Sequence, residues 1–114
     1  KNWKACVRTA EQLVQEAPEK PDGWIHRSFA LHELDQTEKA LSLLEPARDL
    51  FSKQWVIPYN LACYLTQLGR IEEAARELHS ALRINSQAVK TAAATDPDLE
   101  PLRRCIDELR GIDG

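Results

Sequence analysis

The chain has 114 residues, and its 15 lysine and arginine residues against 18 aspartate and glutamate residues give a net charge of −3. This length fits one domain, residues 1–114, with an adequate hydrophobic core. The acidic balance provides no basic field for phosphate backbones or anionic lipid, and no apolar run approaches the roughly 20 residues that cross a bilayer. We therefore expect neither a nucleic acid nor a membrane as partner.

The three cysteines, Cys6, Cys63 and Cys105, are odd in number and widely spaced. This spacing favours reduced thiols over a disulfide framework or a zinc site, and reduced thiols favour a cytoplasmic location. The N-terminus lacks the uncharged core of a secretory signal. Because there is no initiator methionine and a helical pattern already runs at Trp3, we expect the chain to be part of a longer protein.

Apolar residues recur at helical spacing along most of the chain, which predicts an all-α fold of about six helices. A first helix is predicted at 3–17. Two helix pairs follow, the first at 22–35 and 37–51 and the second at 55–68 and 71–84. A short helix at 88–94 stops at Asp96-Pro97, and a last helix runs over about 98–109.

The two predicted pairs are copies of one unit at an offset of 34 residues. Apolar and small residues coincide at this offset, which is the signature of an internal repeat. The coinciding pairs are Leu31 with Leu65, Leu34 with Leu68, Glu38 with Glu72, Ala40 with Ala74, Leu44 with Leu78, Ala47 with Ala81 and Ser52 with Ser86. The short joints at Asp35-Gln36 and Gly69-Arg70 predict antiparallel helices in each pair.

Glycine and proline set further expectations for the helix ends. Gly69 suits the left-handed cap that a tight joint needs. Pro46 falls inside the predicted helix 37–51 and should kink that helix, because proline cannot donate the backbone hydrogen bond.

This 34-residue repeat of two helices joined by a short turn resembles the tetratricopeptide repeat, whose sequence pattern is W-x₂-L-G-x₂-Y, then A-x₃-F, then P. The residues that fill the pattern are Trp24, Ser28, Leu31, Ala40, Leu44 and Ala47 in the first unit, and Pro58, Leu61, Ala62, Leu65, Ala74, Leu78 and Ala81 in the second. The departures are Arg27 at the position of Leu61, Pro58 at the position of tryptophan, and Ser52 and Ser86 at the position of the closing proline.

The resemblance implies a right-handed superhelical stack of antiparallel helix hairpins, a tetratricopeptide-like α-solenoid. In this frame, 3–17 is the second helix of a truncated repeat, 22–51 and 55–84 are complete repeats, and 87–110 is a short C-terminal capping helix pair. The first helix of each repeat would line the concave side.

In similar proteins the concave groove holds an extended peptide or a partner helix. Carrying the frame over gives these groove candidates: Asp22, Ile25, His26, Phe29, Glu33, Val56, Tyr59, Asn60, Cys63, Gln67, Lys90 and Ala94. Asn60 stands out, because its amide can both donate to and accept from a peptide backbone. Ile25, Phe29 and Tyr59 favour an apolar or mixed segment.

A known subclass grips a C-terminal carboxylate with lysines, asparagines and an arginine. Asn60 and Lys90 match two of its positions, but Ile25, Phe29 and Ala94 occupy the other three, which argues against that ligand.

The sequence offers little for catalysis. His26 and Glu33 share a helix face, and His32 with Asp35 could approach, but no third ligand, phosphate loop or activated nucleophile accompanies either pair. We expect no catalytic residues, metal or cofactor.

We therefore interpret the chain as a non-catalytic scaffold that binds a protein or peptide partner in its groove. Two alternatives stay open. One is a structural module that stacks or forms homo-oligomers through the N-terminal helix, by its Trp3, Val7 and Ala10 face; the other is a positioning domain of a larger enzyme. Repeat architecture does not name the partner, its sequence preference or the biological process.

Overall fold

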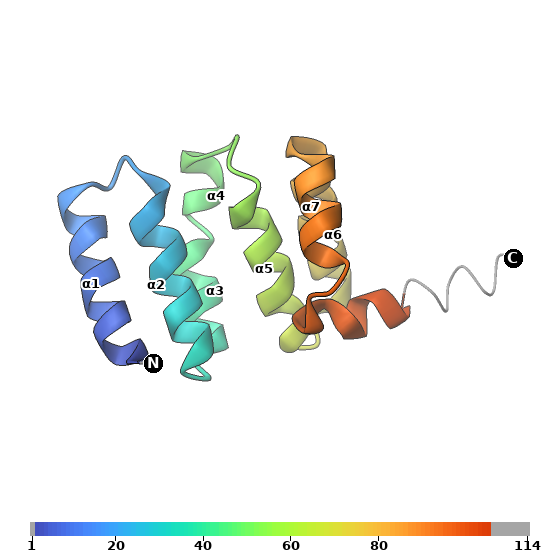
Figure 1. Cartoon of the computed structure of the whole chain (residues 1–114), viewed down its shortest axis with the longest axis horizontal. Coiled ribbons are helices and arrows are strands. Elements are labelled where there is room, and N and C mark those ends of the chain that lie inside the picture. Colours follow the sequence, from blue (N-terminus) through green and yellow to red (C-terminus); the bar gives the residue numbers. More distant parts are fainter. Residues whose placement is uncertain (1, 106–114) are drawn as a thin grey trace, which may run out of the picture.

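The computed structural model describes residues 2–105 and is all-helical over that range, so the predicted all-α class is confirmed (Figure 1). Seven α-helices and one short 3-10 helix have assigned bounds. They are α1 (Trp3–Glu16), α2 (Pro21–Glu33), α3 (Thr37–Leu44), α4 (Ala47–Leu50), α5 (Val56–Gln67), α6 (Ile71–Ile84), α7 (Ser86–Ala93) and η1 (Pro97–Leu99). A further helical turn continues directly from η1 over 100–105.

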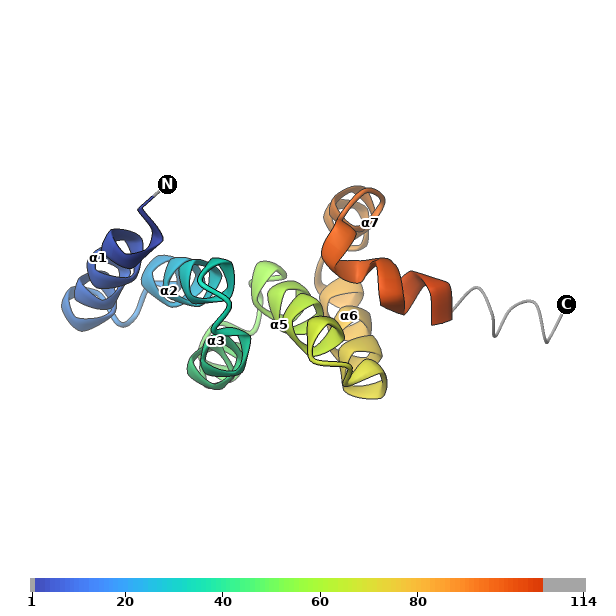
Figure 2. The same ribbon diagram turned by 90° about the horizontal axis from the view of Figure 1, so that it is seen from below.

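Most helices pack against their neighbours in sequence, and the molecule is elongated, with extents of 51 × 27 × 21 Å. α1 packs on α2, α2 on α3, α5 on α6 and α6 on α7, while α5 also contacts α2, α3 and η1. Figure 2 shows α1 at one end, followed along the long axis by α2, α5 and the α6–α7 pair, with α3 on the lower side and the orange-red segment after α7 extending beyond that pair. No helix within residues 2–105 has both the length and the apolar character needed to span a membrane.

The two predicted joints have the same geometry. Asp35 and Gly69 both have a left-handed backbone, with φ of 62° and 78°. In the first joint the Gln36 amide donates to the Leu31 carbonyl and the Asp35 amide to the His32 carbonyl, and Arg70 and Gly69 repeat both bonds 34 residues later. This is the Schellman cap, so the left-handed cap predicted at Gly69 is confirmed.

Pro46, where a kink is predicted, interrupts the helix, although Glu45 and Pro46 keep right-handed helical backbone angles. α3 ends at Leu44 and α4 begins at Ala47, with Pro46 as the residue that precedes it. The predicted helix 37–51 is therefore two helices, α3 and α4. The other predicted helices up to 84 begin and end within two residues of the observed bounds.

Small residues at the repeat period lie where helices approach closely. Ala40, Ala47, Ala74 and Ala81 are completely buried, and Leu44 fills the space beside them. Arg27, the residue that departs from the pattern, is half-buried and lies over the Trp24 ring, with its guanidinium carbon 5.3 Å from the ring centroid. Burial lowers the pKa of Arg27, and one of its guanidinium nitrogens donates to the Leu43 carbonyl over 3.3 Å.

The C-terminal pair is shorter than a complete unit. α7 follows α6 directly, and the Asn85 side chain accepts a hydrogen bond from the Ala88 amide at its start. The last predicted helix, 98–109, is represented by η1 and the turn over 100–105, and its remainder lies outside the described residues.

Candidate functional site

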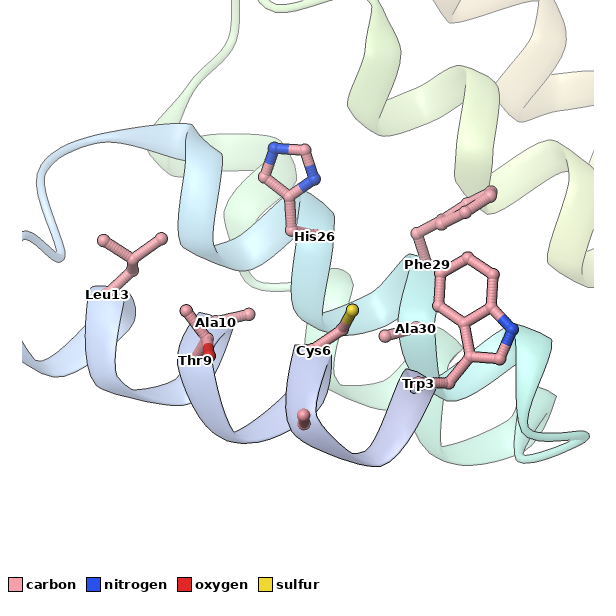
Figure 3. Close-up of a pocket in the computed structure, with 9 residues that line it drawn as sticks. Trp3, Cys6, Thr9, Ala10, Leu13, His26, Phe29 and Ala30 are labelled. Carbon is pink, nitrogen blue, oxygen red and sulfur yellow. The ribbon is translucent and has the colours of Figure 1, made fainter. Parts of the chain in front are cut away.

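An apolar groove of about 350 Å³ runs between α1 and α2 (Figure 3). Its walls carry almost no polar atoms, and the exposed face of each helix supplies one wall. The main lining residues are Trp3, Cys6, Ala10 and Leu13 from α1 and His26, Phe29 and Ala30 from α2. Figure 3 shows Trp3 and Phe29 together at one end of the groove and Leu13 at the other.

The groove owes its exposed apolar surface to two large side chains. The Phe29 side chain is 43% exposed and Leu13 is 39% exposed, whereas Ala10 at the groove floor is only 2% exposed. Trp3 packs edge-on against Phe29, with ring centroids 5.7 Å apart and planes at 72°. An aromatic pair fixed in this way forms a rigid rim for a ligand side chain.

Gly23 explains why α1 and α2 lie so close together. A Cβ atom at Gly23 would lie 2.8 Å from the Val14 backbone nitrogen and 3.0 Å from the Leu13 Cβ. Only glycine allows this approach, which brings the apolar face of α1 against α2. Leu13, which lines one end of the groove, lies at this contact.

The α2 candidates divide into exposed and partly buried positions. Asp22, His26, Phe29 and Glu33 are exposed and share one face of α2, as their helical spacing requires. Ile25 is half-buried and packs against the main hydrophobic core. Four of these five residues therefore lie on a surface that a partner can reach.

The α5 candidates Tyr59 and Cys63 are buried beneath the chain's own C-terminal segment. The Tyr59 hydroxyl donates to an Asp96 carboxylate oxygen over 2.5 Å, and the Cys63 thiol lies 3.7 Å from the same oxygen. Burial raises the pKa of both groups, and the Asp96 carboxylate raises it further. Both groups are therefore neutral at physiological pH.

Two further contacts join this segment to the rest of the molecule. Gln67, an exposed α5 candidate, donates to the Asp98 backbone carbonyl over 2.9 Å. The Asp98 carboxylate lies 3.1 Å from His32 Nε2, and His32 Nδ1 lies 2.9 Å from the Thr37 hydroxyl. The segment 96–98 thus crosses α5 and reaches α2.

A buried hydrogen bond lies beneath this segment. The hydroxyl groups of Ser28 and Tyr64 are 3.1 Å apart, and both residues are buried. The Tyr64 ring also packs against His32, with centroids 5.0 Å apart. These contacts hold α2 and α5 together at a fixed separation.

The remaining candidates lie apart from the α1–α2 groove. Val56 and Asn60 on α5 are half-buried, and the Asn60 amide makes no hydrogen bond within residues 2–105. Lys90 and Ala94 line a separate hollow of about 270 Å³, with Leu78, Leu82 and Arg103 among its other residues. The structure therefore does not bring Lys90 together with the exposed α2 candidates.

Two groups of residues in this region were not among the sequence candidates. Trp3, Cys6 and Leu13 line the groove from α1, and their helical spacing was a visible signal that they share a face. Asp96 and Asp98 cover α5, and nothing in the local sequence indicated where they would lie. His32 was considered as a partner of Asp35 but pairs with Asp98 instead.

Within residues 2–105, no group of three or more histidine, cysteine, aspartate or glutamate side chains could hold a metal ion. Cys6, Cys63 and Cys105 are free thiols. Comparison of the chain with protein-family models and with curated proteins gives no match.

Proposed function

We propose that the chain is a tetratricopeptide-like superhelical segment that binds a peptide or partner helix of another protein, without catalysis, in the groove between α1 and α2. The observation that carries the proposal is the groove's exposed apolar lining, above all Phe29. A large apolar side chain left in water at the edge of a concave surface is typical of a protein-binding site.

Three structural features support the tetratricopeptide-like part of the proposal. Helix hairpins follow one another along the long axis, the two capped joints repeat at the 34-residue offset, and small buried residues recur in the same register. A stack of such hairpins is quasi-one-dimensional and presents its first helices on one side. α2 and α5 are those helices in this proposal.

The α1–α2 groove is a better candidate for the binding surface than the face of α5 that carries Tyr59 and Cys63. Tyr59 and Cys63 are already in contact with the segment 96–98, so a partner would have to displace Asp96 and Asp98 to reach them. Asn60 lies on α5, apart from the groove, and its amide makes no hydrogen bond within residues 2–105, which suits a contact to a peptide backbone. The proposed site therefore consists of the groove and the exposed α2 face, and Asn60 stays a separate candidate contact on α5.

Self-association through the N-terminal helix has less support. Ala10 is buried and Val7 packs against the core, so these residues of the suggested contact face lie against the rest of the molecule. The adjacent side of α1, one residue further round the helix, carries Lys4, Arg8 and Glu11, all exposed. A contact between copies through that side would be polar.

The proposal is tested by selecting peptides of about 15 residues from a random display library and mapping their contacts by NMR shift changes. We expect enriched peptides to shift the α1–α2 groove resonances, and Phe29→Ala to weaken binding about tenfold or more. Leu50→Ala is the matched control, because Leu50 is also a large exposed apolar residue but lies on α4. Peptides whose binding is equally insensitive to both substitutions would overturn the groove as the binding site.

A further inference from the structure

We infer that the ligand of the groove is a basic amphipathic helix of a partner protein, with apolar side chains facing Phe29 and Leu13 and lysine or arginine residues facing Asp22 and Glu33. This inference rests on the proposed function and adds the chemistry of the partner. It is carried by the order of charged and apolar residues along α2 and by the charges around the groove.

Acidic residues lie at both ends of the exposed α2 face. Asp22 is in the first turn, Phe29 is near the middle and Glu33 is the last residue of the helix, and all three are exposed. Asp22 and Glu33 are eleven residue steps apart, a distance of about 16 Å along the helix at a rise of about 1.5 Å per residue. A partner helix with basic residues about three turns apart matches this distance.

Neither of these carboxylates has a cationic partner among the described residues. Asp22 and Glu33 make no hydrogen bond or ion pair within residues 2–105. Three other glutamates are paired in this range, Glu73 with Arg70, Glu77 with Arg48 and Glu100 with Arg103, while exposed glutamates such as Glu38 and Glu72 resemble Glu33 in having no ion pair there. The two carboxylates beside the groove are thus available to cations of a partner.

Basic side chains are directed away from the groove on α1. Lys4 and Arg8 are exposed, and their helical spacing places them on the side opposite Cys6, Thr9 and Leu13, which line the groove. Glu16 follows one turn after Leu13 on the groove side and bonds to Gln12. Of the residues that line the groove, His26 alone carries an ionisable base.

An apolar floor between acidic ends selects its ligand in two ways. The floor gains affinity from apolar side chains spaced three or four residues apart on a helix, since those side chains share one face. The acidic ends favour a basic segment and disfavour an acidic one, because like charges across an interface repel. A helix with both features complements the whole groove.

The test uses three synthetic peptides of about 18 residues with matched helical content. The first carries leucine and phenylalanine on one face with lysines about three turns apart; the second has glutamate for each lysine; the third keeps the lysines and has serine for each apolar residue. Affinities are measured by fluorescence anisotropy at low and at physiological salt. We expect the first peptide to bind at least about tenfold more tightly than either of the others.

The decisive variant is Asp22→Lys/Glu33→Lys, which should reverse the preference between the first and second peptides. Glu38→Lys/Glu72→Lys is the matched control: it changes the net charge equally, and both residues are exposed on helices that do not line the groove. Circular dichroism and urea unfolding verify that both variants fold. A reversal seen in the groove variant alone supports the inference, and an equal reversal in the control overturns it, because net charge would then explain the preference.

The remaining outcomes separate this inference from the proposed function. If the basic and acidic peptides bind equally, and Phe29→Ala weakens both, the charge selection is wrong and the groove function stands. If none of the three binds while library-selected peptides do bind in the groove, the inferred ligand class is wrong and the groove function stands. If none of the three peptides binds and the library-selected peptides bind only outside the groove, both proposals fail.

Discussion

The helices α2 and α5 carry the same repeat positions but present them differently. Phe29 and Cys63 are 34 residues apart in the sequence, yet Phe29 is 43% exposed and Cys63 is 4% exposed. The difference arises because the segment 96–99 lies over α5, whereas the same face of α2 opens into the groove beside α1. A repeat period thus fixes which residues share a face, and the elements that follow decide whether that face is open.

The largest effect is expected from removing the apolar anchor of the covering segment. Leu99 is 1% exposed and lies in η1, which packs on α5. Leu99→Ala should lower the free energy of unfolding by about 2–5 kcal/mol, because it leaves a cavity beneath the segment. Urea unfolding followed by circular dichroism measures the change.

The control for this measurement is Leu50→Ala. Leu50 is 60% exposed, so its truncation should change the free energy of unfolding by no more than about 0.5 kcal/mol. A Leu99→Ala effect as small as that of Leu50→Ala would show that the segment does not close the α5 face.

The cysteines report on the open and closed faces directly. Cys6 is exposed at the groove, while burial and the neighbouring Asp96 carboxylate raise the pKa of Cys63 and keep it protonated. Because the thiolate is the reactive form, iodoacetamide at neutral pH should alkylate Cys6 about a hundredfold faster than Cys63. Peptide mass spectrometry over a time course gives both rates in one experiment.

Leu99→Ala sharpens this labelling experiment. Loss of the anchor should let the segment open more often and raise the Cys63 rate, with no change at Cys6. Equal acceleration of both cysteines would indicate global unfolding instead of local opening.

Gly23→Ala tests the close approach that shapes the open face. The added Cβ would meet the Val14 backbone at 2.8 Å, so one helix must shift, and we expect a loss of about 1–3 kcal/mol in the free energy of unfolding. Calorimetry or urea unfolding measures this loss. The shift should also change the NMR resonances of Trp3 and Leu13 more than those of α6.

Gly69→Ala separates steric overlap from backbone strain. No atom lies within 4 Å of a Cβ at Gly69, but its φ of 78° disfavours residues with a side chain. Gly69→Ala should lower the free energy of unfolding by about 1 kcal/mol without changing the NMR resonances of the groove residues.

If Gly23→Ala lowers the free energy of unfolding no more than a surface substitution does, close packing does not set the width of the groove.

The sequence was sufficient to predict the features that depend on local patterns. The all-α class, the helix at 71–84, the cap at Gly69 and the break at Pro46 follow from residues that are close together in the chain. Helical spacing also places Asp22, His26 and Glu33 on one face of α2 with Phe29. These features require little knowledge of tertiary structure.

The features that could not be predicted depend on contacts between distant residues. Asp96 reaches Tyr59 across 37 positions and Asp98 reaches His32 across 66, and no helical period relates them. Gly23 is different, because a glycine inside a helical pattern is itself a local sign that another backbone approaches closely. The exposure of each candidate therefore required the fold.

The smallest expected effect compares the two joints, where the same conformation is held by different residues. Asp35 adopts a φ of 62° that costs energy for any residue with a Cβ, whereas Gly69 adopts 78° without that cost. Asp35→Gly should therefore stabilise the protein by a net amount of about 0.5–1 kcal/mol. This net gain is smaller than the strain relieved, because glycine has greater freedom in the unfolded chain. Urea unfolding of Asp35→Gly, beside Gly69→Asp with the opposite expected sign, measures both. Because the two joints share the same backbone hydrogen bonds, equal and opposite changes would mean that the backbone alone sets the cost. A destabilised Asp35→Gly protein would mean that the Asp35 carboxylate stabilises its joint, and the two joints would then differ in more than strain.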